Sequence, residues 1–220
     1  MTGNPTRFTA VAGCAFAVLF TGGFVALGEI WGSFGDPDET FIEYYESSGN
    51  RLRDIAGVYL MSGAALAFTI FALGMAQRLQ RPEPSLSPTA LTAMAVLFAT
   101  CLAISASLLG AVALSRAMAD VFDDSGVLEG AEAAVAPQAG YVILAVPGAM
   151  MAGATVFGIS LASWKYSSLP RWVCVFGLAA GPLIFLLAFA GPPFILLPAW
   201  VLAASIAIGR AGPEEPAAGA

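Results

Sequence analysis

Long apolar runs are the feature that most limits what this chain can fold into. They recur along the whole sequence, and each has about 20 residues, enough at ~1.5 Å per helical residue to cross the ~30 Å hydrocarbon core of a bilayer. Charged residues make up 11% of the 220 residues, whereas soluble domains carry about 25%. The runs do not alternate in polarity as the strands of a membrane β-barrel would. The sequence therefore predicts an all-α, polytopic transmembrane helical bundle.

The pattern predicts six spans, which form a single transmembrane domain over residues 1–210. The last run is the shortest, and it is either a span through a thinned region of bilayer or a re-entrant segment. The basic residue Arg210 and the polar tail favour the span. Residues 211–220 are rich in Pro, Ala and Gly, and we expect a disordered cytoplasmic tail. The predicted spans are residues 8–30, 55–77, 88–115, 137–162, 172–190 and 194–209, and the predicted outer loops are residues 31–54 and 116–136.

The basic residues set the predicted orientation. With both termini in the cytoplasm, six of the nine basic residues lie on the inner side and three on the outer side, as the positive-inside rule requires. The acids divide more sharply, with twelve outside and three inside, so the outer side carries a net charge of −9 and the inner side +3. We therefore expect acidic loops on the extracytoplasmic side of a plasma membrane.

The first outer loop carries the signals of a helix of its own. Asp36 is a good N-cap residue, and Glu39 completes a capping box with it. We expect Gly49 to end this helix in a left-handed conformation and Asn50 to cap the next helix. The pattern predicts a short extracytoplasmic helix over residues 37–47, between the first two spans.

The polar side chains of this loop form a candidate interaction site. Arg51 and Arg53 precede the second span and can hold the carboxylates of the 36–46 helix in bidentate contacts, which would clamp the loop onto the spans. The functional alternative is that they bind an anionic lipid headgroup or the carboxylate of a partner. The candidate residues are Asp36, Glu39, Tyr44, Tyr45, Arg51, Arg53 and Tyr59.

Small residues at four-residue spacing predict where the helices pack. In lipid, helix association depends on close approach of the backbones rather than on hydrophobic burial. The third span carries the longest row, so we expect that helix to be central. Pro147 and Pro182 predict kinks in the fourth and fifth spans. The candidate packing stripe consists of Ala95, Ala99, Ala103, Ser107, Ala111, Gly177 and Gly181.

Several kinds of chemistry are disfavoured by what the sequence lacks. The chain has no histidine, which is the commonest general base and a usual ligand of zinc and haem. No acid or base lies near the centre of a predicted span, which counts against proton-coupled transport. The outer carboxylates lack the spacing of an EF-hand, and there is no nucleotide-binding glycine loop or basic patch. We therefore expect no catalytic residue, cofactor, metal site or nucleic-acid partner.

One pattern in the first outer loop has a counterpart elsewhere. Gly35-Asp36, Tyr44-Tyr45, Arg51 and Tyr59-Leu60 lie within 26 residues. This pattern, with the Ala- and Gly-rich composition, resembles one in uncharacterised small multi-pass membrane proteins of actinobacteria and related bacteria. The resemblance implies a bacterial plasma-membrane location and no catalytic activity.

These features together predict an integral interaction or accessory subunit of a membrane assembly. Its partners would be the lipid bilayer and either another membrane protein or a second copy of the chain. A permease or channel for a small neutral or cationic solute is the alternative, suggested by the two proline kinks and the acidic outer surface. An intramembrane lipid-modifying enzyme is a third hypothesis, and it would require convergent carboxylates or an Asp–Arg pair in a hydrated cavity.

The predicted orientation can be tested by chemical labelling. We expect Asp38→Cys and Asp124→Cys, each in a background without the native cysteines, to react with a membrane-impermeant maleimide added to intact cells, because both positions lie on predicted outer loops. Glu214→Cys is the matched inner control and should react only after permeabilisation. Reaction of Asp38→Cys or Asp124→Cys only after permeabilisation would show that the orientation is reversed.

Overall fold

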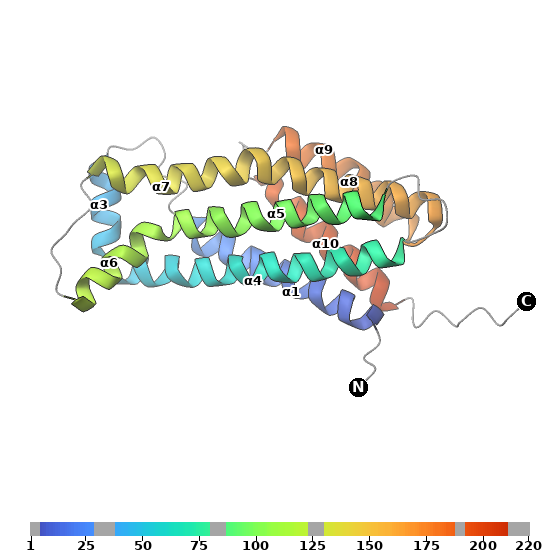
Figure 1. Ribbon diagram of the computed structural model, residues 1–220, viewed down its shortest axis with the longest axis horizontal. Helices are drawn as coiled ribbons and strands as arrows, with labels where there is room; N and C mark the ends of the chain where they lie inside the picture. The colour runs from blue at the N-terminus through green and yellow to red at the C-terminus, as the bar shows by residue number, and fades with distance from the viewer. Residues whose placement is uncertain (1–4, 29–37, 80–86, 123–129, 188–191, 211–220) are drawn as a thin grey trace, which may run out of the picture.

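The computed structural model describes residues 5–28, 38–79, 87–122, 130–187 and 192–210. Within these ranges every regular element is a helix, and the longer helices run side by side in an elongated bundle (Figure 1). The α-helices are α1 (Pro5–Ala26), α3 (Asp38–Glu46), α4 (Ser48–Arg78), α5 (Pro88–Leu109), α6 (Ala111–Phe122), α7 (Gly130–Ile143), α8 (Ala149–Tyr166), α9 (Arg171–Leu186) and α10 (Leu196–Arg210), with a π-helical turn η1 (Leu144–Gly148) and a 3₁₀ turn η3 (Pro192–Ile195).

Four helical segments are long and apolar enough to cross a membrane, which indicates a membrane protein. They are Thr6–Ala26, Ser48–Arg78, Pro88–Leu109 and Ala134–Tyr166. The remaining apolar helices are shorter: α9 has 16 residues and α10 has 15, which correspond to about 24 Å and about 22 Å. The structure thus gives four candidate spans, and the count of six stays a prediction.

One end of the bundle carries an additional helix. Helix α3 lies across the end that α6 and the first turns of α4 and α7 form (Figure 1), and it contacts all three of these helices. We call this region the α3 end. Helix α1 begins and α10 ends at the opposite end of the bundle. The side-by-side helices therefore place the described parts of the two predicted outer loops, residues 38–54, 116–122 and 130–136, at the same end of the bundle.

The third predicted span differs from the observed helix. The sequence predicts one helix over residues 88–115, but α5 ends at Leu109 and α6 leaves in a new direction (Figure 1). Backbone hydrogen bonds continue on both sides of Gly110, whose φ and ψ are −91° and −3°. Without a Cβ, Gly110 lets the Val58 side chain of α4 lie directly against the backbone. The bend therefore forms where α4 touches the glycine.

The two prolines of the predicted kinks are accommodated in different ways. Pro147 lies in η1, where the helix widens to a π turn between α7 and α8. A π turn is a common way to absorb a missing backbone donor. Pro182 lies inside α9, which continues to Leu186. Both proline side chains are exposed on the outside of the bundle.

Aromatic rings fill the centre of the bundle. The ring of Phe68 on α4 lies 5.0 Å from that of Phe16 and 4.9 Å from that of Phe98, between centroids. Phe71 contacts Trp200 of α10 edge-on at 6.3 Å. The Trp200 Nε1–H donates to the Val173 carbonyl oxygen at 3.2 Å, so its buried polar atom is satisfied. This core joins α1, α4, α5 and α10.

The residues of the candidate packing stripe differ in how deeply they are buried. On α5, Ala95 and Ala99 are buried, Ala103 is half-buried and Ser107 is exposed. Ala111 belongs to α6 and is half-buried.

The glycines of the stripe lie in helix contacts of α9. A Cβ placed on Gly181 would lie 2.8 Å from the Gly153 carbonyl oxygen, and one on Gly153 would lie 2.5 Å from the Gly181 oxygen. The backbones of α8 and α9 therefore touch at this point. Gly177 lies against the side chains of Ser160 and Trp200.

We expect Gly181→Ala to lower the free energy of unfolding by about 1–3 kcal/mol, because the added methyl group would have to separate two backbones. The measurement is reversible unfolding in detergent micelles. Gly22→Ala is the matched control, since a Cβ there would meet only Leu60 Cδ1, at an ordinary 3.6 Å. Equal stability of the two variants would contradict a tight α8–α9 contact.

Candidate functional site at the α3 end

A fully buried carboxylate lies at the α3 end. Asp54 has 0% of its surface exposed, although it lies only two turns from the start of α4. It shares one face of α4 with Gly57, Met61 and Phe68, which are buried deeper in the bundle. Burying an ionised carboxylate costs several kcal/mol unless hydrogen bonds and charges compensate for the lost water. The surroundings of Asp54 therefore determine whether this end of the molecule is stable.

The hydroxyl group of Tyr44 links Asp54 to an arginine. The Tyr44 hydroxyl donates to Asp54 Oδ1 at 3.0 Å, and it accepts a hydrogen bond from Arg53 Nη2 at 2.5 Å. The Arg53 guanidinium also lies over the Tyr44 ring, with 5.8 Å between Cζ and the ring centroid. The Tyr44 hydroxyl thus bridges the Arg53 guanidinium and the buried carboxylate, and it fixes α3 to α4.

Burial and the nearby carboxylate keep both tyrosines of α3 protonated. Burial, and next the negative charge of Asp54, raise the pKa of Tyr44 to about 12. The same two causes, burial first, raise the pKa of Tyr45 still further. Both phenols therefore stay neutral well above pH 7, and that of Tyr44 donates a hydrogen bond to Asp54. A general acid or base works best with a pKa near the operating pH, so this pair is suited to holding a structure rather than to proton transfer.

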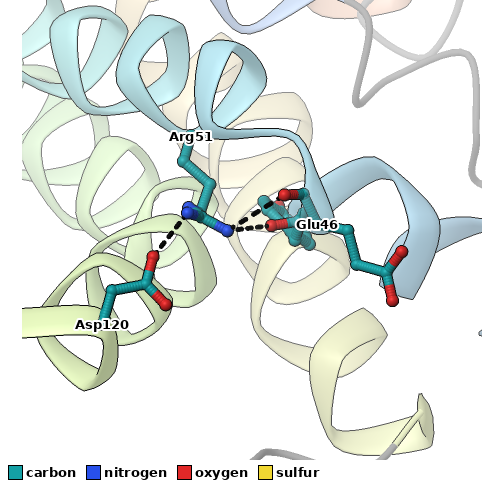
Figure 2. Close-up of polar contacts among 4 residues, drawn as sticks. Glu46, Arg51 and Asp120 are labelled. Atoms are coloured by element: carbon teal, nitrogen blue, oxygen red, sulfur yellow. Dashed lines mark hydrogen bonds and ion pairs between the residues drawn. The ribbon is translucent and has the colours of Figure 1, made fainter. Parts of the chain in front are cut away.

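Arg51 joins three segments of the α3 end (Figure 2). One of its nitrogens donates to the carbonyl oxygens of Tyr45 at 2.8 Å and Glu46 at 3.2 Å, and the other contacts Asp120 Oδ2 of α6 at 2.5 Å. The Arg51 side chain is 15% exposed and that of Asp120 is 62% exposed. Asn50 Nδ2 adds a bond to the Tyr44 carbonyl oxygen at 3.0 Å.

These bonds explain why the predicted capping roles of Gly49 and Asn50 are wrong. The sequence predicts a left-handed Gly49 as the end of the helix and Asn50 as the cap of the next helix. Instead α3 ends at Glu46, Ser47 is the N-cap position of α4, and Gly49 and Asn50 lie in the first turn of α4. The last carbonyls of α3 need donors, and the side chains of Asn50 and Arg51 supply them. No left-handed glycine is needed.

Tyr45 anchors α3 to the remaining helices of this end. Its side chain is 1% exposed and packs with Val112 and Ala113 of α6 and Ala134 of α7. Its ring meets that of Tyr44 edge-on, at 5.1 Å between centroids. This small apolar cluster is separate from the main core. The α3 end is thus a small packed unit with its own core.

The structure brings together four of the candidate residues. Tyr44, Tyr45 and Arg53 lie around Asp54, and Arg51 joins them through the Tyr45 carbonyl oxygen. Tyr59 lies further along α4 with 75% of its surface exposed. Asp36 lies outside the described residues, and for Glu39, in α3, the side chain does.

Asp54 and Asp120 are absent from the sequence-based candidate site, yet they supply its carboxylates. The spacing of Asp54 with the buried residues of α4, three or four positions apart, is the signal that could have identified it. Among the described residues, no three Asp, Glu, Cys or His side chains gather as a metal-binding group.

Together, the four long apolar helices and the closed polar cluster define a helical membrane protein with a structured polar end. Comparison of the chain with protein-family models, with curated proteins and with solved structures found no match.

We expect Tyr44→Phe to destabilise the folded protein by about 1–3 kcal/mol, because Asp54 and Arg53 each lose a hydrogen bond. The effect should depend on pH. With the Tyr44 pKa raised from 10.0 to about 12 in the folded state, its contribution is full below pH 10 and is lost as the pH rises through 12. Unfolding in detergent from pH 7 to 12 should therefore show a smaller alkaline decline for Tyr44→Phe than for the wild type.

Tyr59→Phe is the matched control, because Tyr59 is largely exposed and lies away from Asp54. It should leave both the stability at pH 7 and the alkaline decline unchanged. If Tyr44→Phe behaved like Tyr59→Phe, the hydroxyl group of Tyr44 would not be a link between Arg53 and Asp54.

Proposed function

We propose that the protein is a non-catalytic interaction subunit of a bacterial plasma-membrane assembly, and that a membrane-protein partner docks on its α3 end, on the outer side of the membrane. The observation that supports this proposal is a set of large apolar side chains at the α3 end that are exposed on the surface of the bundle. They lie on α4, α6 and α7 at the α3 end of the bundle.

Helix length supports the placement of the α3 end outside the hydrocarbon core. Helix α4 has 31 residues, or about 46 Å, which exceeds a hydrocarbon core of ~30 Å. Helix α5 alone has 22 residues, or about 33 Å, so α6 begins where the core ends. The segments around α3 would therefore lie in the headgroup layer and in water.

Apolar side chains point outward at this level. Met118 and Val121 lie on one side of α6, and Val121 is 73% exposed. Leu52 of α4, next to Arg51, is 70% exposed, and Val135 of α7 is 63% exposed. Asp120 of α6 instead contacts Arg51. Exposed apolar groups of this kind, rimmed by polar residues, are typical of protein interaction surfaces.

The polar cluster supports the same reading. Asp54 is closed to solvent and Tyr44 is held between Asp54 and Arg53, so the cluster supplies rigidity to the surface above it. A lipid-modifying enzyme would need such an Asp–Arg group open to a hydrated cavity. The kinks that suggested a permease have their prolines, Pro147 and Pro182, on the outside of the bundle. A surface for docking is what the geometry supports best.

We expect purification in a mild detergent to recover a stoichiometric membrane-protein partner, and Val121→Lys to release it, because a charge would enter the apolar contact. The measurement is mass spectrometry and light scattering of the purified complex. Gln77→Lys is the matched control, since Gln77 is an exposed polar residue at the other end of α4, and it should retain the partner. Isolation of a bare monomer in several mild detergents would overturn the proposal.

A further inference from the structure

A pocket opens sideways between α4, α5 and α6, separate from the polar cluster. It has a volume of about 290 Å³, and its apolar walls come from Ile55 and Val58 of α4 and Leu114 of α6. Gly110, at the bend between α5 and α6, also lines it. Because α6 turns away from the axis of α5 at this glycine, a hollow is left on the side of the bundle.

The pocket lies at a defined depth. Tyr59 is 19 residues from Arg78, where α4 ends, and Ser107 is 19 residues from Pro88, where α5 begins. Both distances correspond to about 29 Å along the helix, and the hydrocarbon core is ~30 Å thick. Two neighbouring helices therefore place the pocket at the same boundary, where acyl chains give way to glycerol-ester groups.

Hydroxyl groups are concentrated at this boundary. Tyr59, Ser62 and Ser107 all line the pocket, and all three side chains are exposed. Ser107 donates its proton to the Ala103 carbonyl oxygen at 2.9 Å, which leaves its oxygen as an acceptor. The side-chain hydroxyls of Tyr59 and Ser62 make no hydrogen bond within the described part of the chain, so their protons are available to an acceptor from outside.

Other grooves on the bundle have a different character. The groove between α8 and α9 has a volume of about 350 Å³ and is lined by apolar residues such as Met150, Phe157 and Phe185. The groove between α1 and α10, near Phe24 and Pro198, has a single hydroxyl, that of Thr21. Such surfaces suit acyl chains alone. Above the pocket between α4, α5 and α6, the Arg51–Asp120 ion pair lies two turns beyond Tyr59, at the level of headgroups.

We propose that this pocket binds one diacyl glycerophospholipid. The ester carbonyl groups of the lipid accept hydrogen bonds from Tyr59 and Ser62, and the first methylene groups of an acyl chain pack on Val58 and Leu114. The occupant is a lipid because the pocket opens into the bilayer at the depth of the ester groups. This inference concerns a different surface from the partner contact at Val121, and it does not rest on the proposed function.

Photo-crosslinking tests the proposal. The purified protein is placed in liposomes that contain phosphatidylethanolamine with a diazirine on the acyl chain near the ester, and crosslinked residues are mapped by mass spectrometry. We expect crosslinks to concentrate on the pocket residues of α4 and α5. The double variant Tyr59→Phe/Ser62→Ala, which keeps the pocket open, should lower this crosslinking by about fivefold for each hydrogen bond lost.

Two further variants separate binding from folding. Ser107→Phe fills the pocket and should abolish its crosslinks, whereas Ala154→Phe fills the groove between α8 and α9 and should leave them unchanged. Gel filtration establishes that each variant is folded, and if Ser107→Phe is not, the double variant decides. Crosslinks spread evenly around the bundle, or crosslinks unchanged in the double variant, would each overturn the proposal.

Discussion

Close backbone contact between neighbouring helices is the constraint on which the rest of this structure depends. Lipid tails are as apolar as the side chains they touch, so helices in a bilayer are held together by packing rather than by hydrophobic burial. Helices α8 and α9 meet at Gly153 and Gly181, and Gly23 of α1 lies against the backbone of α4 at Gly57. These contacts align helices of unequal length. The longer helices therefore extend past the shorter ones at the same end of the bundle.

The α3 end is stabilised by polar bonds, because helices that leave the lipid must satisfy their exposed ends and charges in other ways. Helix α3 has only nine residues, which is too short to be stable on its own. Arg51 and Asn50 bind its last carbonyl groups, and Tyr44 joins it to Asp54. One face of α4 thus lies in two environments. Phe68 packs against aromatic rings in the main core, and Asp54 is hydrogen-bonded at the α3 end.

Local signals predict much of this fold, and long-range contacts account for the rest. The sequence predicts the short helix over residues 37–47, and the structure has Asp38–Glu46. Local signals do not predict which groups cap the end of α3 or which carboxylate pairs with Arg51. Asp120 is 69 residues from Arg51, and no local pattern connects them. The bend at Gly110 depends on Val58 of another helix, so a regular row of small residues does not reveal it.

The bend at Gly110 also explains why two unlike surfaces lie next to each other. By turning α6 over α4, it opens the hydroxyl-lined pocket below and directs the side of α6 that carries Met118 and Val121 outward above. A straight helix over residues 88–115 would have continued along the axis of α5 and left neither feature. In the membrane placement that we propose, the two surfaces face different solvents. The hydroxyl groups would meet the ester layer of the bilayer, and the apolar side chains of α6 would lie beyond it, where contact with another protein would cover them.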